Sequence, residues 1–260
     1  MLAIRSLIFN LAFFGGSVVM AVCLLPFMLL SRTAMQWGLK TWSASIMWCL
    51  KVIVGLTWEV RGLENVPNRP CLFACKHQSA WETGIFYHVI ADPSYILKKE
   101  LLKIPFFGWY VARGGAIAID RKAGAAALKM MITSTQDRLA RGQNVVIFPE
   151  GTRAAPGRPG VYHPGIAALY KGANVPVVPA ALNSGVFWQR RSFLKRPGCI
   201  TIEFLPAIEP GLDRRAFMTE LKSSIENATN RLTEEAQARY PKALSAAAIT
   251  AELEAEKAES

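Results

Sequence analysis

The sequence predicts an α/β fold, with a mixed, mostly parallel central sheet flanked by helices and preceded by an N-terminal membrane-associated two-helix segment. Two observations support this fold class. From residue 57 to about residue 240, short apolar runs alternate with helical patterns, which is typical of helices packed around a mostly parallel or mixed sheet. Residues 1–56 are instead predominantly apolar, and residues 241–260 are rich in Ala, Glu and Lys. These changes divide the chain into N-terminal membrane-anchoring helices, one globular domain and a tail.

The anchoring segment, residues 1–56, begins with a long uncharged run. No charged residue lies between Arg5 and Arg32, and the run is rich in Leu, Phe, Val and Met. A helix over it would be about 36–40 Å long, enough to cross or enter the hydrocarbon core of a bilayer. The run is too long for the apolar core of a signal peptide, and no convincing cleavage site follows, so we expect it to be retained. The alternative interpretation is a buried core helix.

A second apolar stretch covers residues 35–56, with Gly55 as its expected end. Lys40 and Lys51 interrupt it, so a helix lying at the membrane interface is favoured over a second full span. The stretch carries three tryptophans, a residue type enriched at such interfaces: Trp37, Trp42 and Trp48. We expect the two segments to form a hairpin that dips into the cytoplasmic leaflet. A pair of true spans is the rival arrangement.

The globular domain is expected to contain seven strands and four helices, assigned from apolar or β-branched runs and from helix-end signals. The strands are predicted at residues 57–60, 71–75, 95–97, 116–119, 145–148, 177–181 and 200–205. The helices are predicted from near Trp81, over residues 123–140 with Gly142 closing it, over residues 166–171 with Gly172 ending it, and from Asp213 to about Tyr240. Beyond Pro241, the composition favours frayed helix or disorder.

The net charge of +11 indicates an acidic partner. Nucleic acid is disfavoured, because no stretch interleaves clustered basic residues with stacking aromatics in a recognisable binding module. Anionic membrane lipids and phosphorylated substrates fit better beside an apolar anchor. The sequence therefore predicts a membrane-bound protein without a nucleic-acid partner.

Cysteine and histidine spacing argues against a metal centre. The five cysteines are odd in number, scattered and without a C-x-x-C pair, which favours reduced, buried thiols: Cys23, Cys49, Cys71, Cys75 and Cys199. The three histidines lack the spacing of metal ligands: His77, His88 and His163. We predict no metal site.

The segment K-H-Q-S-A-W-E contains the first candidate site, His77 and Glu82. His77 follows a strand expected to be buried, where loops of α/β folds commonly hold functional groups. A neutral imidazole can take a proton from an alcohol, and Glu82, about one helical turn on, can accept the N–H of the other ring nitrogen. The alternative is a locally satisfied histidine beside a solvated glutamate, because this spacing alone is weakly specific.

Three further blocks end predicted strands in charged or proline-flanked turns: Gly115–Arg121, Phe148–Arg153 and Val175–Ala180. An arginine beside a strand end can grip a phosphate, although a surface ion pair or an ordinary loop arginine would have the same sequence. The third block is expected to be structural. The aromatic run at residues 104–110 fits buried core, and equally the lining of an acyl pocket or contact with lipid.

With these four blocks in this order, the sequence resembles the glycerolipid acyltransferase family over roughly residues 59–205. The family's usual first motif is N-H-x-x-x-x-D, where this chain has Lys76 in place of Asn and Glu82 in place of Asp. The resemblance implies that His77 is the catalytic base that activates the acceptor hydroxyl and that Glu82 is its partner. A longer carboxylate still reaches the imidazole, so we retain the pair.

The resemblance also implies a set of acceptor-binding residues. Arg121 and Arg153 match positions that hold the phosphate of the acceptor, and their forked guanidinium groups suit bidentate phosphate contacts. Glu150 is expected to contact the acceptor or to order Arg153. Gly151 and Thr152 belong to the same motif and are included in the predicted binding site.

A lysine after the predicted strand at residues 95–97 completes the implied machinery. Lys98 matches a family lysine suited to stabilising an oxyanion, and Lys99 is the competing assignment. The implied reaction transfers a fatty acyl group from acyl-CoA or acyl carrier protein to the sn-2 hydroxyl of lysophosphatidic acid. The product is phosphatidic acid, and the expected location is the cytoplasmic face of a bacterial inner membrane.

No cofactor is expected, because the thioester donor brings its own leaving group. The alternatives are a relative that acts on another acceptor, such as glycerol 3-phosphate or a lyso-aminolipid, and a non-catalytic lipid-binding protein on the same scaffold. The paired His77 and Glu82 argue against the latter, since a pure binder needs neither.

Overall fold

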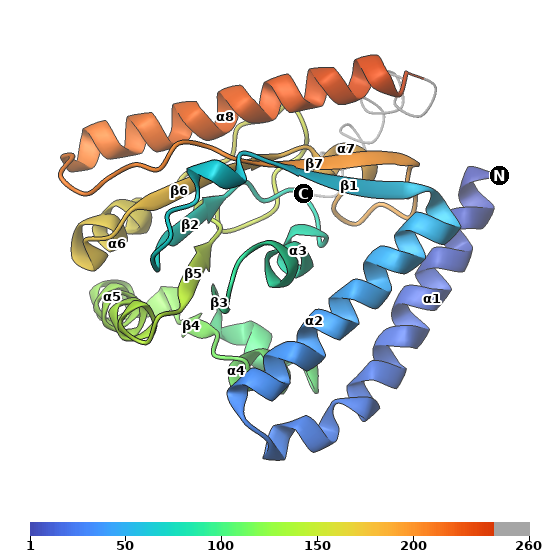
Figure 1. The fold of residues 1–260 in the computed structure, drawn as a ribbon, viewed down its shortest axis with the longest axis horizontal. Helices are drawn as coiled ribbons and strands as arrows, with labels where there is room; N and C mark the ends of the chain where they lie inside the picture. Colours follow the sequence, from blue (N-terminus) through green and yellow to red (C-terminus); the bar gives the residue numbers. More distant parts are fainter. Residues whose placement is uncertain (242–260) are drawn as a thin grey trace.

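A seven-stranded sheet forms the centre of the computed structural model, which describes residues 1–241 (Figure 1). The strands lie in the order β1-β7-β6-β2-β5-β3-β4. Their bounds are β1 (Leu56–Arg61), β2 (Leu72–Cys75), β3 (Pro93–Lys98), β4 (Ile117–Ile119), β5 (Asn144–Ile147), β6 (Val177–Leu182) and β7 (Gly198–Phe204). Neighbouring strands are parallel except for β6 and β7, which are antiparallel. The predicted mixed, mostly parallel sheet is confirmed.

Helices cover the sheet, and two of them precede it. Their bounds are α1 (Leu2–Cys23), α2 (Arg32–Cys49), α3 (Glu82–Val89), α4 (Phe107–Arg113), α5 (Gly124–Ala140), α6 (Gly165–Ala173), α7 (Ser184–Phe187) and α8 (Arg214–Arg239). In Figure 1, α8 lies along one side of the sheet, and α1 and α2 run side by side at one end of the molecule. The predicted tail beyond Pro241 lies outside the described residues.

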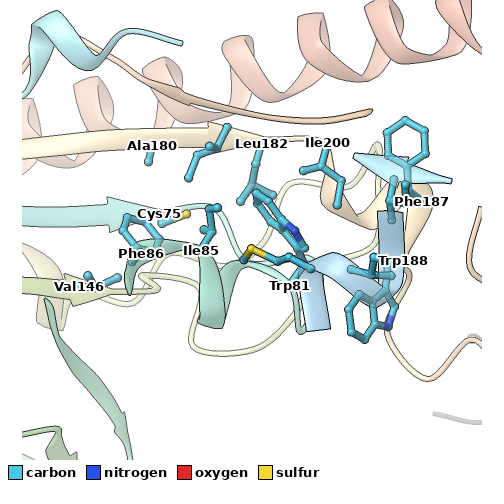
Figure 2. Close-up of a cluster of buried hydrophobic side chains, with 14 of the residues drawn as sticks. Cys75, Trp81, Ile85, Phe86, Val146, Ala180, Leu182, Phe187, Trp188 and Ile200 are labelled. Carbon is cyan, nitrogen blue, oxygen red and sulfur yellow. The ribbon is translucent and has the colours of Figure 1, made fainter. Parts of the chain in front are cut away.

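Two hydrophobic clusters fill the two faces of the sheet. Along β2, Phe73 and Cys75 point into one cluster and Leu72 and Ala74 into the other, as the two-residue period of a strand requires. The first cluster also receives side chains from α3, β5, β6 and α7, as Figure 2 shows. The second contains Phe217, Leu221 and Ile225 of α8. This alternation decides which way the residues after β2 point.

Helix ends follow the predicted signals in most places. Asp213 caps α8 by accepting bonds from two main-chain amides, and Gly142 follows the end of α5 with a left-handed φ of 77°. The prediction that Gly172 ends α6 is wrong, because the helix continues to Ala173 and Asn174 takes the left-handed conformation. Gly172 is instead a packing position: a Cβ there would lie 2.6 Å from the side chain of Ile132 on α5.

Helix α1 ends well before the uncharged run between Arg5 and Arg32 does. Helix α1 stops at Cys23, and a short 3₁₀ turn, η1 (Leu25–Leu29), with Pro26 near its start leads into α2. Proline cannot continue the ladder of an α-helix, so the 22 residues of α1 span about 33 Å. Within residues 1–241, α1 is the one helix long and apolar enough to cross a membrane.

The α1–α2 hairpin, residues 2–49, packs against the globular domain along its length. Near its start, the hydroxyl of Ser6 accepts a bond of 2.9 Å from the main-chain N–H of Lys195. At the turn, the guanidinium of Arg113 on α4 donates to the carbonyl of Met28 at 3.2 Å. On α2, the hydroxyl of Ser43 donates to a carbonyl of α3 at 3.0 Å. The hairpin is therefore part of the folded unit.

The aromatic run at residues 104–110 is partly buried and partly exposed. Tyr110 is buried with Leu24 and Leu39 of the hairpin, whereas Trp109 is nearly half exposed.

The five cysteines differ in how far their side chains are exposed. No disulfide links the five cysteines, which all lie within the described residues, and Cys71 and Cys75 are buried. The expectation of buried thiols is wrong for Cys23, which is exposed at the end of α1.

Candidate active site

The carboxyl ends of four parallel strands, β2, β5, β3 and β4, meet at one edge of the sheet. The register sets this alignment: Ala74 of β2 pairs with Ile147 of β5, and Lys98 of β3 pairs with Ile119 of β4. These strand ends and the segments that follow them carry all the predicted site residues. Sheet order thus gathers segments that are far apart in the sequence.

His77 and Glu82 form a hydrogen-bonded pair at this edge. The imidazole Nδ1 lies 2.9 Å from the Oε1 of Glu82, whose side chain is fully buried. The same oxygen accepts the main-chain N–H groups of Gln78 at 2.6 Å and Ser79 at 2.5 Å. The other oxygen accepts the hydroxyl of Ser184 at 2.8 Å. Four hydrogen-bond donors thus hold Glu82 in place. Its side chain, one methylene longer than that of the Asp in the family's usual motif, reaches the imidazole.

This geometry assigns a tautomer to the histidine. An ionised carboxylate is only an acceptor, so the Nδ1 of His77 carries the proton and Nε2 keeps its lone pair. Among residues 1–241, no hydrogen bond engages Nε2. The ring stacks on Phe148 with a centroid distance of 4.2 Å, and the side chain remains partly exposed. The imidazole is oriented and can accept a proton from a bound hydroxyl.

Ser184 and Phe148 were missed as members of this site. Phe148 belongs to the F-P-E-G-T-R block but was not singled out, although the pairing of β5 with β2 places it beside His77. Ser184 lies two residues after β6, which also pairs with β2. Strand order could have identified both, whereas local sequence could not.

Glu150 lies in an environment that the sequence did not indicate. Its side chain is buried, and its Oε1 accepts the main-chain N–H of His77 at 3.1 Å and lies 3.4 Å from the Nζ of Lys76. Its Oε2 has no hydrogen-bond partner among the described residues. Burial raises the pKa of this carboxyl to about 7, an effect that Lys76 opposes. Neither of the predicted contacts, to the acceptor or to Arg153, accounts for this inward orientation.

A buried ionic cluster continues from Glu150 toward α8. Lys76, which occupies the position of the family's Asn, points its ammonium to within 2.7 Å of the Oε1 of Glu226. The hydroxyl of Tyr162 donates to the same oxygen at 2.9 Å. Lys76 is buried and Glu226 nearly so. Sequence analysis missed Tyr162 and Glu226, because nothing near them in the chain indicates a buried ion pair.

The loop at residues 151–153 contains one of the two predicted phosphate-binding arginines, Arg153, and is contacted by the other, Arg121. Arg121 is exposed and donates to the carbonyl of Gly151 at 3.2 Å. Gly151 has a left-handed φ of 64°, and a Cβ there would come within 2.8 Å of the Arg121 guanidinium. Burial lowers the pKa of Arg153, while the nearby Glu82 raises it and Arg190 lowers it further. Arg190 donates to the hydroxyl of Thr152 at 3.4 Å. Arg121 and Arg190 thus each donate a hydrogen bond to the loop that contains Arg153.

The two candidate lysines differ in their contacts. Lys99 lies with its Nζ 3.5 Å from the Oδ2 of Asp120, and both side chains are exposed. Lys98 ends β3 at the same edge of the sheet as His77 and is exposed. Within residues 1–241, no ion pair or hydrogen bond of its side chain connects Lys98 to the His77–Glu82 pair. Its role as an oxyanion contact stays a prediction.

Comparisons with known proteins agree on one family. A family model described as "Acyltransferase" matches residues 57–183. The chain is 37% identical over 230 residues to a 1-acyl-sn-glycerol-3-phosphate acyltransferase of Pseudomonas aeruginosa, covering 86% of this chain and 88% of the relative. It is 28% identical over 136 residues to a lyso-ornithine lipid O-acyltransferase of the same organism, covering 52% of each.

The fold is also similar to a solved structure. The crystal structure of the 1-acyl-sn-glycerophosphate (LPA) acyltransferase from Thermotoga maritima superposes with a TM-score of 0.72. The match covers 89% of this chain and 99% of that one, at 20% sequence identity. At that identity the match establishes the shared fold.

Proposed function

The chain belongs to the acyltransferase family, and we propose on this premise that it transfers a fatty acyl group to the sn-2 hydroxyl of 1-acyl-glycerol 3-phosphate, forming phosphatidic acid. The observation that carries the proposal is the 2.9 Å contact between the Nδ1 of His77 and the Oε1 of Glu82, which leaves Nε2 able to accept a proton. The 37% identical relative is named a 1-acyl-sn-glycerol-3-phosphate acyltransferase, which supports the choice of acceptor.

The proton transfer follows from this pair. As the acceptor oxygen attacks the carbonyl carbon of the thioester, Nε2 of His77 removes the hydroxyl proton and becomes part of an imidazolium. The buried carboxylate of Glu82 stabilises that cation. Collapse of the tetrahedral intermediate breaks the carbon–sulfur bond, and the leaving thiolate takes the proton back from His77. No acyl-enzyme is required.

Two further roles belong to the proposal. Arg153, within the loop at residues 151–153, and Arg121, which donates to that loop, would hold the phosphate of the acceptor through charge-assisted hydrogen bonds. Lys98 would stabilise the developing oxyanion from the end of β3. Glu150 is too deeply buried to contact the acceptor directly, so we assign it to the support of the His77 main chain.

The donor is proposed to be an acyl thioester of coenzyme A or of acyl carrier protein. Either supplies a thiolate leaving group, so the reaction as written needs no bound cofactor or metal. The two arginines at the site favour a phosphorylated acceptor over a lyso-aminolipid. Glycerol 3-phosphate has the same phosphate and remains the competing acceptor within the family.

Membrane association accounts for the outer face of α1. Leu11, Phe14 and Val18 are each about two-thirds exposed on one side of this apolar helix. We propose that the α1–α2 hairpin dips into the cytoplasmic leaflet of the bacterial inner membrane, rather than crossing it. The domain contacts of Ser6 and Arg113 support this, because they hold both the start of the hairpin and its turn against the globular domain.

A labelling experiment separates the hairpin from two spans. A single cysteine placed at Ser31, in the turn between the helices, is tested in a background that lacks the native cysteines. A hairpin predicts no reaction with an impermeant maleimide added from the periplasmic side, and reaction once the membrane is opened. Modification from the periplasmic side would contradict the dipping hairpin and favour two spans.

An acceptor panel tests the proposed activity. The purified protein is incubated with labelled oleoyl-CoA and with lysophosphatidic acid, glycerol 3-phosphate or a lyso-ornithine lipid in turn. We expect labelled phosphatidic acid with the first acceptor and at least about tenfold lower kcat/KM with the lyso-ornithine lipid, which lacks the phosphate, since one lost charge-assisted contact costs about that much. Glycerol 3-phosphate keeps the phosphate but lacks the acyl chain and its apolar contacts, so kcat/KM should also be lower with it. Transfer to the lyso-ornithine lipid alone would contradict the proposed acceptor, and the absence of transfer to any acceptor would contradict an acyltransferase.

A further inference from the structure

The buried ionic cluster consists of Lys76, Glu150, Tyr162 and Glu226, of which only Glu150, as support for the His77 main chain, has a part in the reaction as described. It lies directly behind His77, because successive residues of an extended segment point to opposite faces. His77 points to the face that carries α3, whereas Lys76 points to the face that carries α8. The base and the cluster are therefore separated by the thickness of one backbone.

One carboxylate joins the cluster to the base. The Oε1 of Glu150 accepts the main-chain N–H of His77 at 3.1 Å and lies 3.4 Å from the ammonium of Lys76. Lys76 in turn lies 2.7 Å from Glu226, which stands on a helix 150 residues away in the sequence. Three polar contacts, of 2.7, 3.4 and 3.1 Å, therefore connect Glu226 through Lys76 and Glu150 to the main-chain N–H of His77.

The charges in the cluster do not balance. One ammonium, that of Lys76, faces two carboxylates, and burying charges without full compensation is costly. The groups around Glu150 are Lys76 directly after β2, Glu226 of α8, Tyr162 of the loop between β5 and α6, the thiol of Cys75 and the main-chain N–H of His77. Burial raises the pKa of Glu150 to about 7; Lys76 opposes that rise and Glu226 adds to it. Either partner can therefore change the charge of Glu150 near neutral pH.

We propose that Lys76 and Glu226 are positioning residues for acyl transfer, which anchor the main chain of His77 through Glu150 so that the imidazole meets Glu82 in the productive orientation. The inference rests on the proposed function, and it adds α8 to the parts of the molecule on which the chemistry depends. Neither residue touches a substrate.

Glu226→Gln is the primary test, because it keeps the shape of the side chain and removes its charge. We expect kcat with lysophosphatidic acid to fall about tenfold, with KM for both substrates changed less than twofold, since misplacing a catalytic group affects the reacting geometry more than binding. Without the neighbouring carboxylate, Glu150 ionises more easily, so the acid limb of the kcat profile should move about one unit to lower pH. Glu220→Gln, an exposed change on the same helix, is the matched control.

Lys76→Met should act in the opposite direction on the pH profile. Removing the ammonium leaves Glu150 without its buried cation, so the acid limb should move about one unit or more to higher pH, with a larger fall in kcat. A purely structural role predicts no such opposed shifts. If Lys76→Met fails to fold, Glu226→Gln and Glu226→Asp carry the test, and the shorter aspartate should restore the acid limb while leaving kcat low.

Hydrogen–deuterium exchange supplies a readout that does not need turnover. In Glu226→Gln, the peptide containing His77 should exchange several-fold faster than in the unmodified protein, because the His77 N–H is held by Glu150. Unchanged exchange and a pH profile like that of Glu220→Gln, in a protein that still acylates lysophosphatidic acid, would overturn the inference and leave the proposed function standing. Faster exchange in a protein without transferase activity would overturn only the proposed function.

Discussion

The α1–α2 hairpin and the carboxyl edge of the sheet depart in opposite ways from the usual distribution of polar and apolar groups. On the hairpin, Phe14 and Val18 are exposed, whereas at the sheet edge Lys76, Glu82 and Glu150 are buried. Exposed apolar side chains and buried charges both raise the free energy of an isolated folded protein. Contact with lipid would remove the first cost, and the second is retained where a reaction needs fixed, desolvated charges.

The two regions also differ in how their partners are arranged. The apolar side chains of α1 face outward and require only an apolar surface to bind. Their contributions to the free energy of membrane binding should therefore be nearly additive along the helix. The charges at the sheet edge are bound to one another within hydrogen-bonding distance, so the loss of one leaves another buried and unpaired. The comparison predicts graded effects of mutation in the hairpin and large, coupled effects at the sheet edge.

The largest effect is expected from His77→Ala. The imidazole is the proton acceptor of the proposed reaction, so we expect kcat to fall by about 10²–10⁴-fold while KM for the acceptor stays within a few-fold. Steady-state transfer from labelled oleoyl-CoA measures both constants. His163→Ala, at an exposed loop position, is the control and should retain activity. Turnover near that of the unmodified protein in His77→Ala would refute the mechanism and remove the chemical reason for the buried charges.

A double substitution, Phe14→Asp with Val18→Asp, tests the other half of the comparison. These residues are one helical turn apart on the exposed face of α1, and burying each in lipid is worth about 1.5–3 kcal/mol, so vesicle binding should weaken at least about 100-fold. Co-sedimentation with vesicles of phosphatidylethanolamine and phosphatidylglycerol measures it. Ser223→Asp with Asn227→Asp adds the same charge at exposed positions of α8 and should bind normally. Equal binding by both variants would show that the hairpin face is not the membrane contact.

Arg153→Lys should produce a smaller and selective effect. Lysine keeps the charge but loses the forked geometry, so we expect KM for lysophosphatidic acid to rise about tenfold and KM for the acyl donor to change less than twofold. Arg158→Lys, an exposed position in the same loop, is the matched control. Equal changes in both Michaelis constants would contradict a phosphate-binding role for Arg153.

The smallest effect concerns stability at the sheet edge. Burial raises the pKa of Glu150 from 4.5 to about 7, so the folded protein binds this proton more tightly than the unfolded chain does. The stability associated with this group is therefore lost as the pH rises from 4.5 to 7, by up to about 3 kcal/mol. We expect the Tm of Glu150→Gln minus the Tm of the unmodified protein to be several degrees higher at pH 8.5 than at pH 4.5. A relative Tm that stays constant between these pH values would show that Glu150 is not held in a costly ionised state.

Most of the fold could be predicted because its signals are local. All seven strands and the ends of α5 and α8 follow from apolar runs, Gly142 and the capping Asp213. Helices α4 and α7 were not predicted as helices. Helix α4 has seven residues and α7 has four, too few to display a helical period. The true end of α1 depended on one proline within an otherwise uniform apolar run.

By itself, the sequence determined the pairing of His77 with Glu82, because five residues of chain and one helix start suffice to bring them within reach. Only the tertiary structure decided that Ser184 binds Glu82 from 102 residues away, that Glu150 faces inward, and that Lys76 meets Glu226. These contacts depend on the order of the strands and on which face of the sheet each side chain enters. Strand order is set by the packing of the whole core, and no local pattern of residues encodes it.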